Sequence, residues 1–357
     1  MNLLKRIEAF ARLGYLMQES GNAGNQPSFK GAEEQRAFEE LQFEICDAPH
    51  YNGWFTEPMV RKAISSLGKS MTMENLEKWL KPYLKHLAEI NENQSIGLVM
   101  AGNIPAVGFH DLLCVLITGN KLKAKLSSDD NRLIPALTKL LVAIEPGFAD
   151  SVMFTNDRLN GFNAIIATGS NNSARYFEYY FGKYPHIIRK NRNGVAVLTG
   201  KESQDELQLL CSDIFSYYGL GCRNVSHLYV PREYDFVPLL DACQQWVAVN
   251  DNHKYFNNYE YNKAIFLVNS TAHFDAGNLL VTESASLASA VSVLHYEYYS
   301  NVDGLQKKLE VLQDQIQCVV AADSLFDFSI PFGKSQEPQL WDYADGIDTI
   351  GFLMGLK

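Results

Sequence analysis

The sequence has no excess of basic residues and no long apolar run, and each absence excludes a class of protein. Its 357 residues contain 31 Lys and Arg against 41 Asp and Glu, a formal charge of −10 at pH 7. A phosphate backbone is bound by concentrated positive charge, so we expect no nucleic-acid partner. No stretch reaches about 18 uninterrupted apolar residues, so we also expect no membrane span.

Cysteine and histidine are also scarce. The six cysteines form no CxxC pair, and the eight histidines form no HxxxH pattern or zinc-like cluster. The opening residues MNLLKRIEAFARLG place charges within an amphipathic helix, unlike the apolar core of a signal peptide. We therefore expect reduced thiols, a cytoplasmic location and no metal ion.

The spacing of apolar residues along the sequence changes near residue 95. Apolar residues recur at helical spacing through the first 95 residues, and Thr72 is the expected N-cap of a helix that continues to residue 90. Beyond residue 95, short apolar runs alternate with helical patterns, which predicts an α/β protein with mainly parallel sheets. Strands are expected at 95–103, 121–128, 151–156, 164–170, 194–200, 226–231, 264–269, 292–299 and 318–323. Helices are expected at 108–119, 130–144, 171–181, 203–219, 235–249 and 301–314.

Polar residues follow two of these strands, at the carboxyl ends where open α/β sheets bind ligands. In AGNIPAVGFHD, the amide of Asn103 is suited to donate to a developing oxyanion, although Asn also forms turns without any chemical role. In AIIATGSNNSARYF, the strand runs through Thr168, Gly169 and Ser170 into a helix whose first N–H groups suit a phosphate.

A third segment, KLKAKLSSDD, has a lysine and two hydroxyls at the end of a strand. Lys125, Ser127 and Ser128 precede an expected helix cap at Asp129 or Asp130. Such a group suits a sugar hydroxyl or a phosphate. The alternative is a solvated lysine at a sheet edge.

The fourth segment, YYGLGCRNVSHLYVP, contains a cysteine in a glycine-containing loop ahead of a strand. Gly219 and Gly221 allow a sharp turn, and Arg223 with nearby N–H groups would favour the thiolate of Cys222. A Cys222–His227 hydrolase pair is a further hypothesis, but no orienting acid is evident. Three other cysteines lie mid-helix among apolar neighbours, which predicts buried, inert thiols: Cys114, Cys211 and Cys243.

In their order along the chain, GNIP, AKLSS, ATGS and GLGC resemble motifs of the aldehyde dehydrogenase superfamily. Six segments are together similar to the LuxC-type acyl-CoA reductase family: NGWFTEPMVRKAI, GNIPAVGFHD, RKNRNGVAVLTG, YYGLGCRNVSHLYVP, SVLHYEYY and PFGKSQEPQLWDYADGIDTIGFL. The similarity spans residues 45 to 355 approximately. It implies a helical segment at 1–95, a Rossmann-type cofactor domain at 96–200, an α/β catalytic domain at 201–325 and a C-terminal segment at 326–357.

The resemblance also implies a role for individual residues. Cys222 corresponds to the acylated nucleophile and Asn103 to an oxyanion donor. The remaining correspondences concern cofactor binding: Lys125 with Ser127 and Ser128 near the adenosine ribose, Thr168, Gly169 and Ser170 at the pyrophosphate, and Glu283 at the nicotinamide ribose.

Three departures from the superfamily pattern refine this expectation. Oxidising members have a glutamate base where IIRKNRNGVAVL has Arg189 and Lys190, so an acyl-enzyme here would not be hydrolysed readily. Ser128 replaces a frequent acid, which would repel a 2′-phosphate, and therefore favours NADP(H). Ala174 replaces a helix-packing glycine.

The implied function is NADPH-dependent reduction of a fatty acyl-CoA, or of an acyl group on a partner protein, to the aldehyde. Two alternatives remain: an acyltransferase that uses the same cysteine, and a non-catalytic subunit of an acyl-transferring complex. The tail DYADGIDTIGFLMG alternates apolar and polar residues, which is typical of an exposed strand. Such a strand pairs either with its own sheet or across a homo-oligomer.

Overall fold

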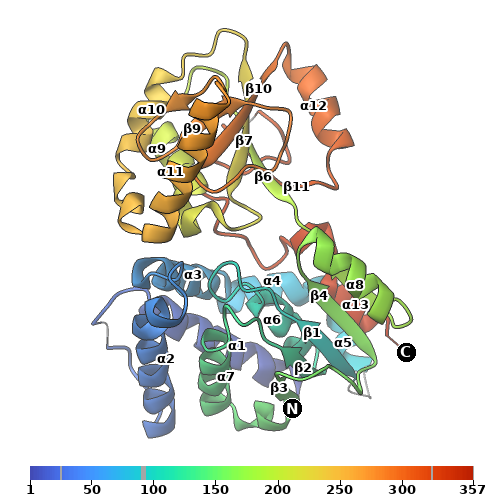
Figure 1. Cartoon of the computed structure of the whole chain (residues 1–357). Coiled ribbons are helices and arrows are strands. Elements are labelled where there is room, and N and C mark those ends of the chain that lie inside the picture. Colours follow the sequence, from blue (N-terminus) through green and yellow to red (C-terminus); the bar gives the residue numbers. More distant parts are fainter. Residues whose placement is uncertain (25, 90–93, 323–324, 357) are drawn as a thin grey trace. The chain divides into compact units, whose positions relative to one another are not determined.

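The computed structural model describes residues 1–24, 26–89, 94–322 and 325–356, which form two compact units (Figure 1). The first unit contains residues 1–190 and 338–357, and the second contains residues 191–337. Residues 90 and 323, at the ends of an expected helix and an expected strand, lie outside the described residues. The division implied by the resemblance, into a helical segment at 1–95, a cofactor domain at 96–200, a catalytic domain at 201–325 and a C-terminal segment at 326–357, stays a prediction.

Helices fill the described part of the chain ahead of the first strand, as the sequence predicts. They are α1 (Leu3–Glu19), α2 (Ala32–Tyr51), α3 (Glu57–Ser70), α4 (Met73–Leu80) and α5 (Leu84–Glu89). The expected cap of α4 is confirmed, because the Thr72 hydroxyl accepts the Asn75 N–H at 3.2 Å. Leu76, Trp79 and Leu80 on one face of α4 are buried in the core that these helices share with the first sheet.

The described residues of the first unit contain a five-stranded parallel sheet of order β3-β2-β1-β4-β5. Its strands are β1 (Ser95–Val99), β2 (Lys121–Lys125), β3 (Val152–Thr155), β4 (Ala164–Thr168) and β5 (His186–Arg189). Its helices are α6 (Phe109–Ile117), α7 (Leu133–Ile144) and α8 (Asn171–Phe181). The strand order reverses between β1 and β4, and in such sheets ligands bind where the carboxyl ends of the strands flank this point.

The described residues of the second unit contain a six-stranded sheet of order β11-β6-β7-β10-β9-β8, in which only β8 is antiparallel to its neighbour. Its strands are β6 (Asn193–Val197), β7 (Val225–Pro231), β8 (Phe274–Asp275), β9 (Leu280–Glu283), β10 (Val293–Tyr299) and β11 (Ile316–Ala321). Its helices are α9 (Gln204–Phe215), α10 (Val237–Gln244), α11 (His253–Val268) and α12 (Val302–Val311). The α/β prediction with mainly parallel sheets is therefore confirmed.

The strand expected at 264–269 is wrong, because these residues end helix α11 and continue into a turn. Asn252 caps the helix by accepting the N–H groups of Lys254 and Tyr255. The helix buries Tyr255 and Tyr259, while Leu267 and Val268 stay exposed. The apolar run at 264–269 is therefore the largely exposed end of a helix. A run this short is compatible with a strand as well as with a helix.

The C-terminal tail also differs from the expected strand. Thr349–Met354 forms the short helix α13, capped by the Asp348 side chain, which accepts the Gly351 N–H at 2.8 Å. Trp79 Nε1 donates to the Tyr343 hydroxyl at 2.8 Å, which fastens the tail to α4. The tail is therefore part of the first unit, and homo-oligomerisation stays a prediction.

Candidate active site

The carboxyl ends of β2, β1 and β4 bring three of the predicted segments to one edge of the first sheet. Val99 at the end of β1 is in register with Lys125 on β2 and with Ala167 on β4. The turn with Asn103, the loop with Ser127 and the entry to α8 therefore start at the same level of neighbouring strands. This edge includes the reversal in strand order, where a dinucleotide binds in sheets of this kind.

The Asn103 turn and the Ser127 loop are packed tightly together. A Cβ on Gly102 would lie 2.5 Å from the Ser127 hydroxyl oxygen, so only glycine fits there. Asp130 Oδ2 accepts the Ala106 N–H at 2.7 Å, and Ala106 has a left-handed φ of 54°. These contacts fix the shape of the turn, while the Asn103 side chain is exposed.

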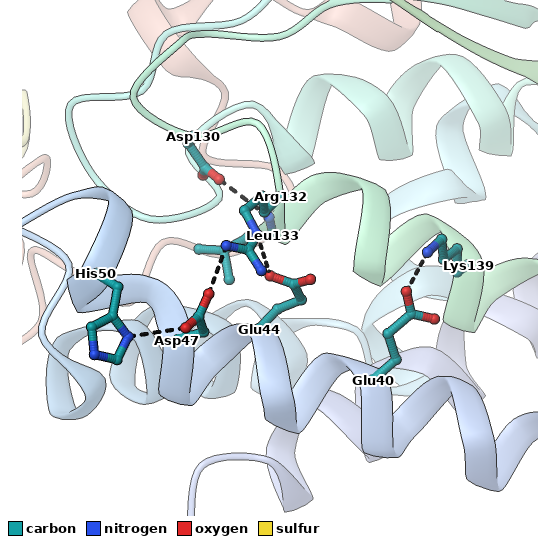
Figure 2. Close-up of polar contacts among 8 residues, drawn as sticks. All are labelled: Glu40, Glu44, Asp47, His50, Asp130, Arg132, Leu133 and Lys139. Carbon is teal, nitrogen blue, oxygen red and sulfur yellow. Dashed lines mark hydrogen bonds and ion pairs between the residues drawn. The ribbon is translucent and has the colours of Figure 1, made fainter.

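Helix α2 anchors the same loop from the other side (Figure 2). Arg132 pairs with Glu44 and Asp47 of α2, in each case at 2.6 Å. Asn52, at the end of α2, donates from its amide to the Asp129 carbonyl at 3.1 Å. Helix α2 thus has a definite role in the first unit, because it holds the loop that carries Ser127 and Ser128.

Helix α8 begins directly at the carboxyl end of β4. The Ser170 hydroxyl accepts the Ser173 N–H at 3.2 Å, so Ser170 is the N-cap of the helix. A Cβ on Gly169 would lie 2.9 Å from both Ser173 Cβ and the Phe177 ring. Glycine at this position therefore allows the backbone to pass close to these two residues of α8 as it enters the helix. The first N–H groups of an 11-residue helix thus lie at the edge of the sheet, a position suited to a phosphate.

Asp130 is a buried carboxylate whose pKa is raised to about 6, chiefly by desolvation and against the hydrogen bonds from Ala106 and Leu133. A raised pKa means that the folded chain holds this proton more tightly than the unfolded chain does. The stabilising contribution of protonated Asp130 is therefore complete below pH 3.8 and is lost as the pH rises through about 6.

We expect the Asp130→Asn variant to gain stability relative to wild type, by about 2 kcal/mol, as the pH rises from about 4 to about 6. The amide oxygen of Asn still accepts the Ala106 N–H but does not titrate. Urea unfolding measured across this pH range tests the expectation, with the exposed neighbour in Asp129→Asn as the control. Identical pH profiles for wild type and Asp130→Asn would contradict it.

In the second unit, Cys222 is exposed in the loop between α9 and β7. The chain reaches it through a left-handed turn with positive φ at Tyr217 (53°), Tyr218 (58°) and Gly219 (75°). Of the two glycines expected to shape this approach, Gly219 has the positive φ and Gly221 does not. Two buried tyrosines in a costly conformation indicate that the surrounding packing fixes the turn.

Asn224 fastens the cysteine loop to the end of α9. Its side-chain amide donates to the carbonyls of Asp213 and Ser216 at 2.9 and 2.8 Å, and its oxygen accepts the Gly221 N–H at 2.8 Å. Sequence reasoning missed this residue. The sequence offered one indication, because Asn224 stands between the candidate nucleophile Cys222 and the start of a buried strand.

Arg223 ties the other side of the cysteine loop to residues 333–335. Its Nε donates to the Ser335 carbonyl at 2.5 Å. The fully buried Asp213 accepts the N–H groups of Ser335 and Gly333 at 3.0 and 2.7 Å. The guanidinium therefore has a structural partner, and the loop that carries Cys222 is held from two sides.

The start of β6 lies directly beside the cysteine loop. Gly194 is in register with Val225, and a Cβ on Gly194 would lie within 2.8 Å of the carbonyl oxygens of Arg223 and Asn224. The segment KNRNG leading into this strand contains no carboxylate. Arg189, which precedes that segment, is buried in the first unit, where it pairs with Asp111 and donates to the Thr349 hydroxyl at 2.9 Å.

His227 does not have the features of a general base. It is buried in β7, its Nδ1 lies 3.0 Å from the Ser286 carbonyl, and its ring packs on Tyr229 at 4.6 Å. Burial lowers its pKa to about 4, so its imidazole is neutral at pH 7. These contacts account for His227 as a core residue of the second sheet.

Glu283 is not brought to the cysteine end of the sheet. It ends β9 in register with Tyr296, and Tyr296 is in register with Leu228 on β7, well beyond the loop that precedes that strand. The loop that follows Glu283 returns toward the cysteine instead, because the Ser226 hydroxyl donates to the Leu287 carbonyl at 2.8 Å. The correspondence of Glu283 to the nicotinamide ribose, which the resemblance implies, stays a prediction.

The described part of the chain has two further properties that bear on the sequence expectations. It contains no helix that is both long and apolar enough to cross a membrane. Among the same residues, no three or more His, Cys, Asp or Glu side chains are grouped so that they could hold a metal ion. The thiols of Cys114, Cys211 and Cys243 are buried, which confirms the burial expected for them.

Comparison with solved structures finds this fold in aldehyde dehydrogenases. Aldehyde dehydrogenase 21 of Physcomitrella patens, in complex with the reaction product succinate, matches with a TM-score of 0.57 and 12% identity over 98% of this chain and 87% of that chain. KauB of Pseudomonas aeruginosa matches with a TM-score of 0.56 and 13% identity over 90% and 72%. A mutant of the P. syringae indole-3-acetaldehyde dehydrogenase AldA, in complex with NAD+ and IAA, matches with a TM-score of 0.55 and 13% identity over 92% and 74%.

The chain therefore has the aldehyde dehydrogenase fold, with a Rossmann-like parallel sheet and a helical N-terminal segment. At identities of 12–13% these likenesses establish the fold and not the substrate. No family model and no curated protein matches the sequence.

Proposed function

We propose that this chain reduces an acyl thioester to its aldehyde, with NADPH as the reductant and Cys222 as the acylated nucleophile. The observation that carries the proposal is the setting of Cys222, an exposed thiol in a loop held from two sides, beside a strand start without a carboxylate. The aldehyde dehydrogenase fold and the resemblance to LuxC-type acyl-CoA reductases support the same chemistry. The acyl donor is a fatty acyl-CoA or an acyl group on a partner protein.

The proposed reaction begins when the Cys222 thiolate attacks the thioester carbonyl. A new carbon–sulfur bond forms to Cys222, the bond to the donor sulfur breaks, and the donor leaves as a free thiol after taking a proton. NADPH, when bound, supplies the hydride that the acyl carbon requires. The resulting thiohemiacetal on Cys222 then releases the aldehyde and regenerates the thiolate. One thioester, one NADPH and one proton thus give one aldehyde, one thiol and one NADP+.

Asn103 is the proposed donor to the oxyanion that forms in both steps. Its exposed amide follows β1 at the carboxyl edge of the first sheet, and Asp130 fixes the turn that carries it. A fixed donor stabilises the tetrahedral oxyanion because it does not reorganise as charge develops on the oxygen. This role rests on the resemblance and on the rigidity of the turn.

The residues at the strand reversal fit a dinucleotide. The N-terminus of α8 and the close approach that Gly169 permits suit a pyrophosphate. Lys125, half-buried at the end of β2, suits a ribose hydroxyl or a phosphate of the adenosine half. We assign Thr168, Gly169 and Ser170 to the pyrophosphate, with Ser170 contributing mainly as the helix cap. Glu283 stays the proposed contact of the nicotinamide ribose, on the strength of the resemblance alone.

The lack of a carboxylate in KNRNG, the segment where oxidising members of the superfamily have their glutamate base, favours reduction over oxidation. Hydrolysis of an acyl-enzyme needs a general base to activate water, and such a group contributes about 10²- to 10⁴-fold. Without it, the acyl-enzyme persists until it is reduced or passed to another thiol. An acyltransferase shares this property, so consumption of NADPH is the measurement that separates the two activities.

We expect a preference for NADPH over NADH that depends on Ser128. Ser128 is exposed in the loop after β2, and its small hydroxyl leaves space for a 2′-phosphate. In Ser128→Glu, a carboxylate would repel the phosphate and accept hydrogen bonds from the ribose hydroxyls of NADH, so the preference should shift toward NADH by about tenfold or more. Rates with each nucleotide at one thioester concentration test this, with Asp129→Asn as the control. A wild-type preference for NADH would refute the role of Ser128.

A further inference from the structure

The first unit contains a cavity of about 600 Å³ that is separate from the edge with the candidate cofactor residues. Asn120 and Ser151 of its wall directly precede β2 and β3, so the cavity lies at the amino ends of the strands. Leu116 and Phe148 form an apolar part of the wall. The volume is within the range of small-molecule sites, which is about 300 to 1,000 Å³.

Arg6 is the charged side chain of this cavity, and its charge is not neutralised within the described residues. It is 9% exposed and forms no ion pair with a described carboxylate. Its Nε donates to the Ile117 carbonyl at 2.8 Å and its Nη1 to the Met1 carbonyl at 2.7 Å, both neutral acceptors. Burial lowers the pKa of Arg6, with no opposing acid. A nearly buried guanidinium without a counter-charge favours an anion beside it.

The third nitrogen of Arg6, Nη2, donates no hydrogen bond to the described residues. Space for the guanidinium is provided by Gly119, which has a φ of 88° and on which a Cβ would lie 3.1 Å from Nη1. Glu145, next to the cavity wall, instead accepts the Gly147 N–H at 3.0 Å. A charged donor that lines the cavity is therefore left for a ligand.

The N-terminus of α1 adds a second favourable contribution at the same place. Leu3 and Leu4, the first residues of this 17-residue helix, line the cavity. First-turn N–H groups have no acceptor within their helix, and the Asn2 side chain accepts only that of Lys5, at 2.9 Å. The helix dipole therefore favours negative charge where the Arg6 guanidinium also lies.

We propose that this cavity binds a small oxyanion, a carboxylate or a phosphate monoester, through Arg6 Nη2 and the first turn of α1. Ser151 also lines the cavity, and its hydroxyl suits the polar part of such a ligand. The leucines and Phe148 suit a short hydrocarbon portion. The proposal is independent of the chemistry proposed for Cys222.

Binding is tested by titrating the purified full-length chain with inorganic phosphate in one series and with butyrate in another, by calorimetry at constant ionic strength against chloride. Saturable binding of either anion, with a dissociation constant of the order of 1 mM or tighter, is the expected result. Binding of only one anion identifies the class of ligand. The proposal is overturned if neither anion binds saturably.

Two variants assign the binding to this cavity. Arg6→Met should weaken binding at least tenfold, with the exposed arginine in Arg36→Met as the control. Because Arg6→Met also removes the bond to the Ile117 carbonyl, it can fail to fold. Ser151→Trp fills the cavity from the residue directly ahead of β3, leaves the Arg6 bonds intact and should also weaken binding at least tenfold. Undiminished binding in Ser151→Trp would refute the site.

Discussion

The Cys222→Ala variant is expected to take up no acyl group from radiolabelled acyl-CoA in the absence of nucleotide. Alanine has no sulfur with which to form the thioester, so the loss should be complete. Wild-type protein should retain label through gel filtration, because the segment beside Cys222 contains no carboxylate to activate water. Scintillation counting of the protein fraction measures the difference.

Cys46 provides a matched control for this experiment, because its thiol is also exposed. Cys46→Ala should acquire label to the same extent as wild type. Hydroxylamine should remove the label from both proteins, as expected for a thioester. Label that persists in Cys222→Ala and disappears in Cys46→Ala would assign the nucleophile to Cys46 and refute the proposed mechanism.

The second large effect is expected for Asn103→Ala, which should lower the rate of acyl reduction by about 10² to 10³. The amide donates to an oxyanion that exists only as the carbonyl is attacked, so kcat should fall while KM for the thioester changes little. Steady-state kinetics at saturating NADPH separate the two constants. Because the Asn103 side chain is exposed, we expect the variant to retain its fold. Thermal unfolding of both proteins checks this.

Asn103→Asp is the matched control for charge. It preserves the shape of the side chain but places a negative group beside the developing oxyanion, so the rate should fall at least as far as in the alanine variant. Equal kcat values for wild type, Asn103→Ala and Asn103→Asp would show that Asn103 is only a turn former.

Much of the architecture was predictable from periodicity, because helices and buried strands impose patterns that neighbouring residues share. The capping box of α9 illustrates this, since a serine followed three residues later by a glutamate is typical of a helix start, and Ser203 and Glu206 form its reciprocal bonds. The run at 264–269 and the C-terminal tail were mispredicted. In both, a short apolar pattern was compatible with a strand and with a helix, and the packing of the surrounding chain decided the outcome.

The groups that support the candidate site could not be predicted, because they act across long separations in sequence. Asp130 fixes a turn 24 residues away, and Asp213 holds a loop more than 100 residues away. Each of these carboxylates is ordinary in its own sequence neighbourhood and becomes identifiable only when its buried partners are seen. Glu283 ends β9 at the level of Leu228 on β7, and its contact with the nicotinamide ribose, which the resemblance implies, stays a prediction.

The central claim is that an acyl group on Cys222 is released by reduction. The most direct measurement mixes the purified chain with NADPH and a series of acyl-CoA thioesters, and quantifies nucleotide oxidised, thiol released and aldehyde formed. The account predicts equal amounts of all three, with no NADPH oxidised when the thioester is omitted. Release of thiol with stable acylation of the protein, but without NADPH oxidation or aldehyde, would contradict it and indicate an acyltransferase.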